Sequence, residues 1–273
     1  MNSASLSTSS ASLATVIVQI GGIPIGFRPN DPDFCEAIQE RYAGFLSSRV
    51  APACQFDIHI TAAIEPSYDD ARVSSEGSVW RLERGDFQAE WDRQTNNGWI
   101  RQCANPYSLD TVLRITHSLI LAGEGGFLVH AASAVKNGRS YLFAGISGSG
   151  KTTITRCAPS DVTVLSDEIS YVRRSGNAYL AYGTPFAGEL ARSGENISAP
   201  LHAVFLLEKG PENRIDPISA KNAAQALMRH ILFFANEPTI VERVFDSALE
   251  FASVVNVCKL VFTPDARAWH VIP

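Results

Sequence analysis

The sequence lacks the features that mark secreted, membrane-bound or nucleic-acid-binding proteins. Its five cysteines are scattered through 273 residues without a C-x-x-C pair, so neither a disulfide framework nor a zinc site is expected. The formal net charge of −5 offers no positive excess for nucleic acid or an anionic membrane surface, and we expect neither as a partner. No apolar run reaches the roughly 20 residues of a membrane-spanning helix. The Ser/Ala-rich residues 1–14 lack the basic start and apolar core of a signal peptide. We therefore expect a cytoplasmic protein with a disordered tail at residues 1–14.

The first half of the chain predicts strands and two helices. Apolar and polar residues alternate in several short segments, which is typical of a twisted antiparallel sheet. These segments are residues 56–60, 79–82, 87–91 and 99–102. Apolar residues recur every three to four positions after Asp31, which predicts a capped helix. A second helix is expected from Ser108, as its N-cap, to Leu121.

A cluster of glycines at residues 123–126 is the best candidate domain boundary. The hydrophobic content of 45% is enough for a sizeable core on either side of it. We predict an α/β protein in which residues 15–124 form an α+β domain rich in antiparallel strands. Residues 125–273 would form a nucleotide-binding domain with a mixed sheet.

Residues 145–152 match the phosphate-binding pattern G-x-x-x-x-G-K-S/T and follow an apolar run at residues 141–144. Glycines let the backbone curl so that successive N–H groups point at one anion, and the helix that follows adds its positive end. The alternative is a glycine-rich turn that binds no nucleotide. The predicted nucleotide-binding residues are Gly145, Ser147, Gly148, Ser149, Gly150, Lys151, Thr152 and Thr153.

The motif also predicts the cofactors, ATP and Mg²⁺. Lys151 would reach the β- and γ-phosphates, and the hydroxyl of Thr152 would complete the magnesium shell.

The strand before this loop is predicted to be antiparallel to its neighbour. Asn137-Gly138 is a strong two-residue hairpin signal between apolar runs at residues 127–135 and 139–144. A turn this short cannot make a parallel crossover. His130 would then lie beside the strand that leads into the loop, and it is a candidate catalytic residue. A buried histidine bonded to backbone would give the same sequence pattern.

Two adjacent carboxylates, Asp167 and Glu168, follow a short β-branched run at residues 161–165. Phosphoryl transfer needs one carboxylate for magnesium and another to take the acceptor proton. Neighbouring residues of a strand point to opposite faces, so both tasks require the chain to bend there. The alternative is a solvated acidic turn. Two interpretations are also open for Glu189 and Arg192. Arg192 could neutralise phosphoryl charge, or the two residues could form an ordinary surface ion pair.

Together these motifs resemble the C-terminal catalytic domain of the HPr kinase/phosphorylase family, which shares its core with the phosphoenolpyruvate carboxykinases. The resemblance rests on residues 130–135, 145–152 and 165–168 and on the Asn137-Gly138 turn. It implies that Asp167 is the acid/base, that Glu168 and Thr152 hold magnesium, and that His130 supports the acid/base step. Glu168 stands where that family has aspartate, and its E-x-R-G-x-G pattern is missing, so phosphorylase activity is not part of the prediction.

The resulting hypothesis is an ATP-dependent kinase, with Asp167, His130 and Lys151 as catalytic residues, that acts on a serine of a protein or precursor peptide. The resemblance also implies a homo-oligomer. Two alternatives stay open: an ATP-binding regulatory or scaffold module without transfer, and a small-molecule kinase with the same core. The sequence has no Leu-Ser-Gly-Gly and no Asn-Lys-x-Asp motif, which disfavours transport ATPases and GTPases.

Overall fold

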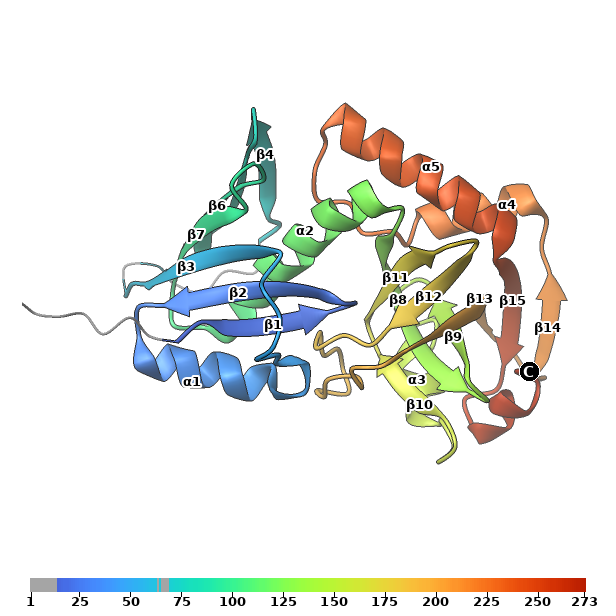
Figure 1. Cartoon of the computed structure of the whole chain (residues 1–273). Helices are drawn as coiled ribbons and strands as arrows, with labels where there is room; N and C mark the ends of the chain where they lie inside the picture. Colours follow the sequence, from blue (N-terminus) through green and yellow to red (C-terminus); the bar gives the residue numbers. More distant parts are fainter. Residues whose placement is uncertain (1–13, 63, 65–68) are drawn as a thin grey trace, which may run out of the picture.

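The computed structural model describes residues 14–62, 64 and 69–273, and its strands form two mixed sheets (Figure 1). The α/β class is therefore confirmed. All but the last residue of the predicted tail lies outside the described residues. The helices are α1 (Pro32–Arg41), α2 (Pro106–Glu124), α3 (Lys151–Arg156), α4 (Ala220–Met228) and α5 (Pro238–Val254). In the part of the chain that the structure describes, no helix combines the length and apolarity needed to cross a membrane.

The first sheet has the strand order β1-β2-β3-β7-β6-β5-β4. Its strands are β1 (Val16–Ile20), β2 (Ile23–Pro29), β3 (Cys54–Ile60), β4 (Arg72–Glu76), β5 (Val79–Arg84), β6 (Phe87–Asp92) and β7 (Asn97–Gln102). The prediction of an antiparallel sheet is right for β1–β2 and for β4 to β7, but β3 runs parallel to both β2 and β7. The parallel β2–β3 pair arises because α1 carries the chain back across the sheet between them.

The second sheet has the order β10-β8-β11-β12-β13-β15-β14, with β9 paired to β8 and β13. Its strands are β8 (Phe127–Lys136), β9 (Arg139–Ala144), β10 (Thr163–Ser166), β11 (Ile169–Ser175), β12 (Ala178–Tyr182), β13 (Ser198–Lys209), β14 (Arg214–Pro217) and β15 (Asn256–Phe262). Because β8 pairs with β9 and β11, and β13 pairs with β9 and β12, these five strands close into a ring.

The predicted hairpin before the phosphate loop is confirmed. Strands β8 and β9 pair antiparallel, and the turn residues Asn137 and Gly138 have φ angles of 51° and 73°. Two successive positive φ angles are the geometry of a type I′ turn. On its other edge β9 runs parallel to β13. The loop-bearing strand thus has one antiparallel and one parallel neighbour.

Helix α2 starts three residues earlier than the sequence suggested. Its N-cap is Asn105, whose side chain accepts a hydrogen bond from the N–H of Tyr107 at 3.0 Å, and Pro106 fills the first helical position. The predicted cap, Ser108, is instead buried and donates to Asp86 at 2.5 Å. The Asn-Pro pair was the stronger start signal, because proline at the first position gives up an N–H that no helix bond would use.

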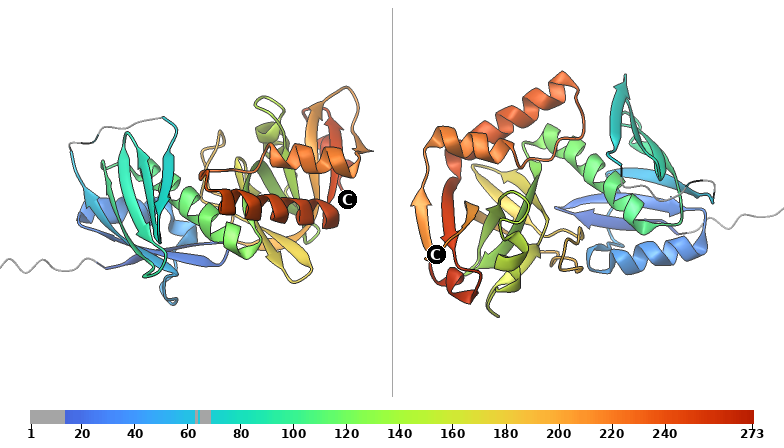
Figure 2. Two further views of the ribbon diagram at one scale, coloured as in Figure 1. Left: turned by 90° about the horizontal axis from the view of Figure 1, so that it is seen from above. Right: turned by 180° about the vertical axis from the view of Figure 1, so that it is seen from behind.

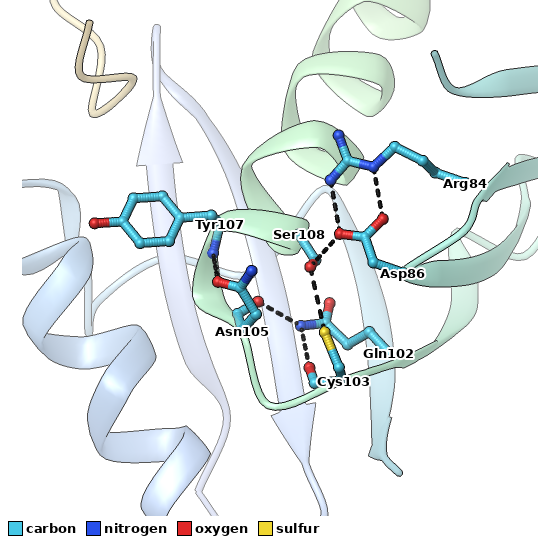
Figure 3. A network of polar contacts seen from close by, with 7 residues as sticks. All are labelled: Arg84, Asp86, Gln102, Cys103, Asn105, Tyr107 and Ser108. Carbon is cyan, nitrogen blue, oxygen red and sulfur yellow. Dashed lines mark hydrogen bonds and ion pairs between the residues drawn. The ribbon is translucent and has the colours of Figure 1, made fainter. Parts of the chain in front are cut away.

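A buried polar network ties the start of α2 to the first sheet (Figure 3). Arg84 donates two hydrogen bonds to Asp86, at 2.6 and 2.8 Å, and Asp86 also accepts from Ser108. The side chain of Gln102 donates to the backbone oxygens of Cys103 and Asn105. Since Asp86 is 1% exposed, its charge depends on these partners, and the network holds α2 in place.

The far end of α2 packs on the second sheet, so this helix bridges the two halves (Figure 2). The Nδ1 atom of His117 lies 3.1 Å from the hydroxyl of Tyr171 in β11. Arg173, also in β11, donates to the carbonyl of Gly21 at 2.6 Å in the turn between β1 and β2. One continuous apolar core includes buried residues of both sheets. A boundary at residues 124 and 125 stays a prediction.

Candidate phosphate-loop site

Residues 145–150 form a tight loop between the end of β9 and the start of α3. Gly148 and Gly150 have φ angles of 77° and 108°, which side chains other than glycine rarely adopt. At Gly150 an added Cβ would also lie 2.6 Å from Cζ of Phe262. Helix α3 begins at Lys151, directly after the loop, where the motif predicts a helix. The strand, loop and helix expected around the motif are all present.

A cavity of about 500 Å³ opens above this loop. Most of the predicted site residues line it: His130, Ser147, Gly148, Gly150, Lys151, Thr152, Thr153, Asp167 and Glu168. Gly145 lines an adjoining cavity instead, and the hydroxyl of Ser149 is buried behind the loop without a partner in the described residues. Ala187, Gly188, Glu189 and Lys209 complete the lining.

Lys151 folds back over the loop. Its Nζ donates to the carbonyl of Gly145 at 2.9 Å and lies 3.5 Å from the carbonyl of Ile146. Burial lowers the pKa of Lys151, and the nearby carboxylates of Glu168 and Glu189 oppose that shift. The ammonium therefore sits at the first residues of the loop, between the backbone cradle and the acidic side of the cavity.

The chain bends at the acidic pair. The hydroxyl of Ser166 accepts hydrogen bonds from the N–H groups of Glu168, at 3.2 Å, and Ile169, at 3.0 Å. This side-chain bond replaces strand pairing between the end of β10 and the start of β11. As a result both carboxylates reach the same cavity, which a straight strand would not allow. The bend required by the sequence argument is confirmed.

Asp167 is 5% exposed and is held by backbone donors. Its Oδ1 accepts from the N–H of Gly188 and its Oδ2 from the N–H of Leu190, both at 2.9 Å. These bonds tie the segment after β12 to the bend. Asp167 is therefore an anchor for one wall of the cavity as well as a carboxylate that faces it.

Glu168 is half-buried, and burial raises its pKa, with Asp167 adding to the rise and Arg114 and Lys151 opposing it. Arg114 was not predicted, because it lies on α2, far from the motif in sequence. Its guanidinium lies 4.9 Å from the ring centroid of Phe186, and its Nε is buried without a partner in the described residues. It supplies positive charge behind the acidic pair.

His130 lies on β8 opposite Ile169 of β11, at the edge of the cavity. Burial lowers its pKa, and the positive charge of Lys151 lowers it further. The imidazole is thus neutral near pH 7 and can accept or pass a proton. Its backbone N–H donates to the carbonyl of His230 at 2.7 Å, which fixes the strand but not the role of the imidazole, so both interpretations of this histidine stay predictions.

Two further expectations concern Glu189 and Arg192. Glu189 lines the cavity, whereas Arg192 lines a separate one beyond Asp167. Within the described residues no ion pair joins them, so the alternative of a surface ion pair is not formed. Lys209, at the end of β13, was missed because only the parallel pairing of β13 with β9 brings it to the loop.

The residues present fit a nucleotide with magnesium. The cavity holds the hydroxyl of Thr152 and the carboxylate of Glu168, and magnesium in phosphate sites typically takes one or two such ligands plus phosphate oxygens and water. No group of three or more His, Cys, Asp or Glu side chains that could hold a metal alone occurs in the described part of the chain. Lys151 lines the same cavity, and its ammonium would exchange the loop carbonyls for a phosphate when nucleotide binds.

Residues 107–272, more than half of the chain, match the family model described as SynChlorMet cassette protein ScmC. The chain belongs to the ScmC family. The ScmC match starts at the first turn of α2 and includes Arg114, the loop and the acidic pair. A comparison with curated proteins finds no match.

The identification with the HPr kinase/phosphorylase family is therefore wrong. The features that suggested it were a phosphate loop, a hairpin turn and an acidic pair. Each of these features depends on the backbone geometry or the charge of a few adjacent residues. Unrelated families can therefore share all three. Residue roles taken from that resemblance now depend on the geometry of this chain alone.

Proposed function

We propose that this protein is an ATP- and Mg²⁺-dependent kinase that phosphorylates a serine hydroxyl of a protein or peptide. The observation that carries the proposal is the convergence of Lys151, Thr152, Asp167, Glu168 and His130 on one cavity. These side chains come from α3, from the bend after β10 and from β8. Phosphoryl transfer needs little beyond such a set of positioned charges.

The loop amides and Lys151 would hold the polyphosphate, and Thr152 and Glu168 would hold the metal. When bound, magnesium supplies positive charge that offsets the charge developing on the phosphate oxygens. The serine oxygen forms a bond to the γ-phosphorus while the bond to the departing ADP oxygen breaks. The serine proton passes to Asp167, with the neutral His130 beside it as a second acceptor.

A macromolecular acceptor is supported by the exposure of the cavity rim. Ser147, Gly148, Glu189 and Lys209 all line the cavity and are exposed. A segment of another chain can reach a site with such an open rim, whereas small-molecule sites usually enclose most of their ligand.

One observation favours a second candidate, an ATP-binding module that does not transfer phosphate. Both oxygens of Asp167 already accept backbone hydrogen bonds. If that anchoring role is its only one, the cavity binds nucleotide without an acid/base.

The two candidates are separated by incubating the purified protein with γ-labelled ATP, Mg²⁺ and a library of serine-containing peptides. The kinase proposal expects label on peptide, dependent on Mg²⁺ and absent in Lys151→Ala. Binding of ATP without label on any peptide would favour the module and contradict the kinase.

A further inference from the structure

A second cavity, of about 440 Å³, adjoins the phosphate loop on the side of α4. We call it the α4 pocket, and its outer wall consists of Ile146, Leu206, Leu207, Ala226, Arg229 and His230. It shares His130 and Ser147 with the main cavity. The two cavities therefore meet at the loop and at the candidate proton acceptor.

The loop also indicates where the γ-phosphate of a bound nucleotide would lie. The lysine of such a loop reaches the β- and γ-phosphates, and its Ser/Thr hydroxyl holds the magnesium ion. Lys151 and Thr152 both line the main cavity, while Nζ of Lys151 lies on the carbonyl of Gly145, a residue that lines the α4 pocket. The γ-phosphate would thus lie in the main cavity, at the part of the loop that borders the α4 pocket.

The chemistry of the two cavities also differs. The main cavity contains three carboxylates, those of Asp167, Glu168 and Glu189. The α4 pocket is lined by apolar side chains and by basic ones, and no acidic side chain of the described residues lines it. Burial lowers the pKa of both His130 and His230. Among the described residues that line the α4 pocket, the exposed Arg229 is therefore the one permanent charge.

Resting on the proposed kinase function, we infer that the α4 pocket binds the acceptor, and that this acceptor is an acidic peptide segment with an apolar residue beside the serine. Ile146, 79% exposed at the loop tip, and Leu206 offer contacts for the apolar residue. Arg229 pairs with a carboxylate of the segment. With these neighbours bound in the α4 pocket, the serine enters the main cavity, which Asp167 also lines, beside His130 on the side shared by the two cavities.

The test uses the full-length protein, γ-labelled ATP with Mg²⁺, and a serine peptide library randomised at the flanking positions. Wild type is expected to label peptides with acidic and apolar neighbours at least about tenfold better than peptides with basic neighbours. Arg229→Glu should reverse the charge preference, and Ala226→Trp should fill the pocket and weaken labelling of every peptide about tenfold. ATP affinity should stay within about twofold in both variants, since neither residue touches the phosphate cradle.

Arg243→Glu, an equal charge reversal on the exposed face of α5, is the matched control and should keep the wild-type preference. Labelling without an acidic preference, or a preference unchanged in Arg229→Glu, overturns the inference and leaves the kinase standing. No label on any peptide overturns the kinase, and the inference with it.

Discussion

Oδ1 of Asp167 lies 2.9 Å from the amide nitrogen of Gly188, 21 residues further along the chain. This contact, with its companion from Leu190, fastens the segment after β12 over the acidic pair. The carboxylate that sequence reasoning assigned to proton transfer thus also shapes the cavity. Any variant of Asp167 changes two properties at once, and experiments must measure both.

Asp167→Asn is expected to reduce both stability and transfer. Whichever way the amide turns, its NH₂ group faces the N–H of Gly188 or Leu190, so one buried donor loses its acceptor. The loss should lower the free energy of unfolding by about 1–3 kcal/mol. Urea unfolding measures the change in the free energy of unfolding, and label transfer from ATP measures the loss of phosphoryl transfer. Asp161→Asn, at an exposed carboxylate before β10, is the control. An unchanged free energy of unfolding in Asp167→Asn would contradict the anchoring role.

Lys151→Ala is expected to weaken ATP binding by at least about tenfold, because a charge-assisted contact to the phosphates is lost. Isothermal titration with ATP and Mg²⁺ measures the affinity. Lys221→Ala, at an exposed lysine of α4, removes the same charge away from the cavity and should bind like wild type. Equal affinities for wild type and Lys151→Ala would show that the loop is not the nucleotide site.

Gly188→Ala is expected to disturb the acidic pair. A Cβ there would lie 2.8 Å from Cβ of Glu168 and 2.9 Å from Oδ2 of Asp167, so the wall must move. Overpacking of this kind costs about 1–3 kcal/mol of stability, and transfer should fall with it. Thermal unfolding and label transfer are the measurements. The control, Gly123→Ala in α2, meets no atom within 4 Å and should be as stable as wild type or up to about 1 kcal/mol more stable. Full activity of Gly188→Ala would contradict this prediction, because the segment that carries Gly188 would then accommodate the methyl group without disturbing the acidic pair.

His117 should make the protein acid-sensitive. Burial, with a smaller contribution from Arg173, lowers its pKa from 6.5 to about 3. The unfolded chain then binds a proton below pH 6.5 that the folded chain does not, so stability is complete above pH 6.5 and falls as the pH drops toward 3. Between pH 7.5 and 5.0 the loss should be about 2 kcal/mol.

Urea unfolding at these two pH values checks the assignment in His117→Phe, which should lose that part of the pH dependence. Tyr171→Phe removes the hydroxyl that His117 contacts but keeps the imidazole, and it should retain the dependence. Identical pH dependence in wild type and His117→Phe would exclude His117 as its source.

Local signals predicted local structure well. Asn137-Gly138 predicted the hairpin, Asp31 caps helix α1 as expected, and the loop lies between strand and helix. The helix expected from Ser108 was mispredicted at its first turn, because Asn105-Pro106 supplied a better cap. The family resemblance failed because it was assembled from such local signals.

The sequence by itself determined the conformation of the loop at residues 145–150 and the hairpin before it, since both depend on backbone geometry that a few adjacent residues dictate. The position of Lys209, the charge of Arg114 behind Glu168, and the anchoring of Asp167 by Gly188 were decided only by the tertiary structure. Each of these joins elements far apart in the chain through the pairing of β13 with β9 or the packing of α2 across both sheets. Such pairings follow from the burial of whole faces, which no short stretch of residues encodes.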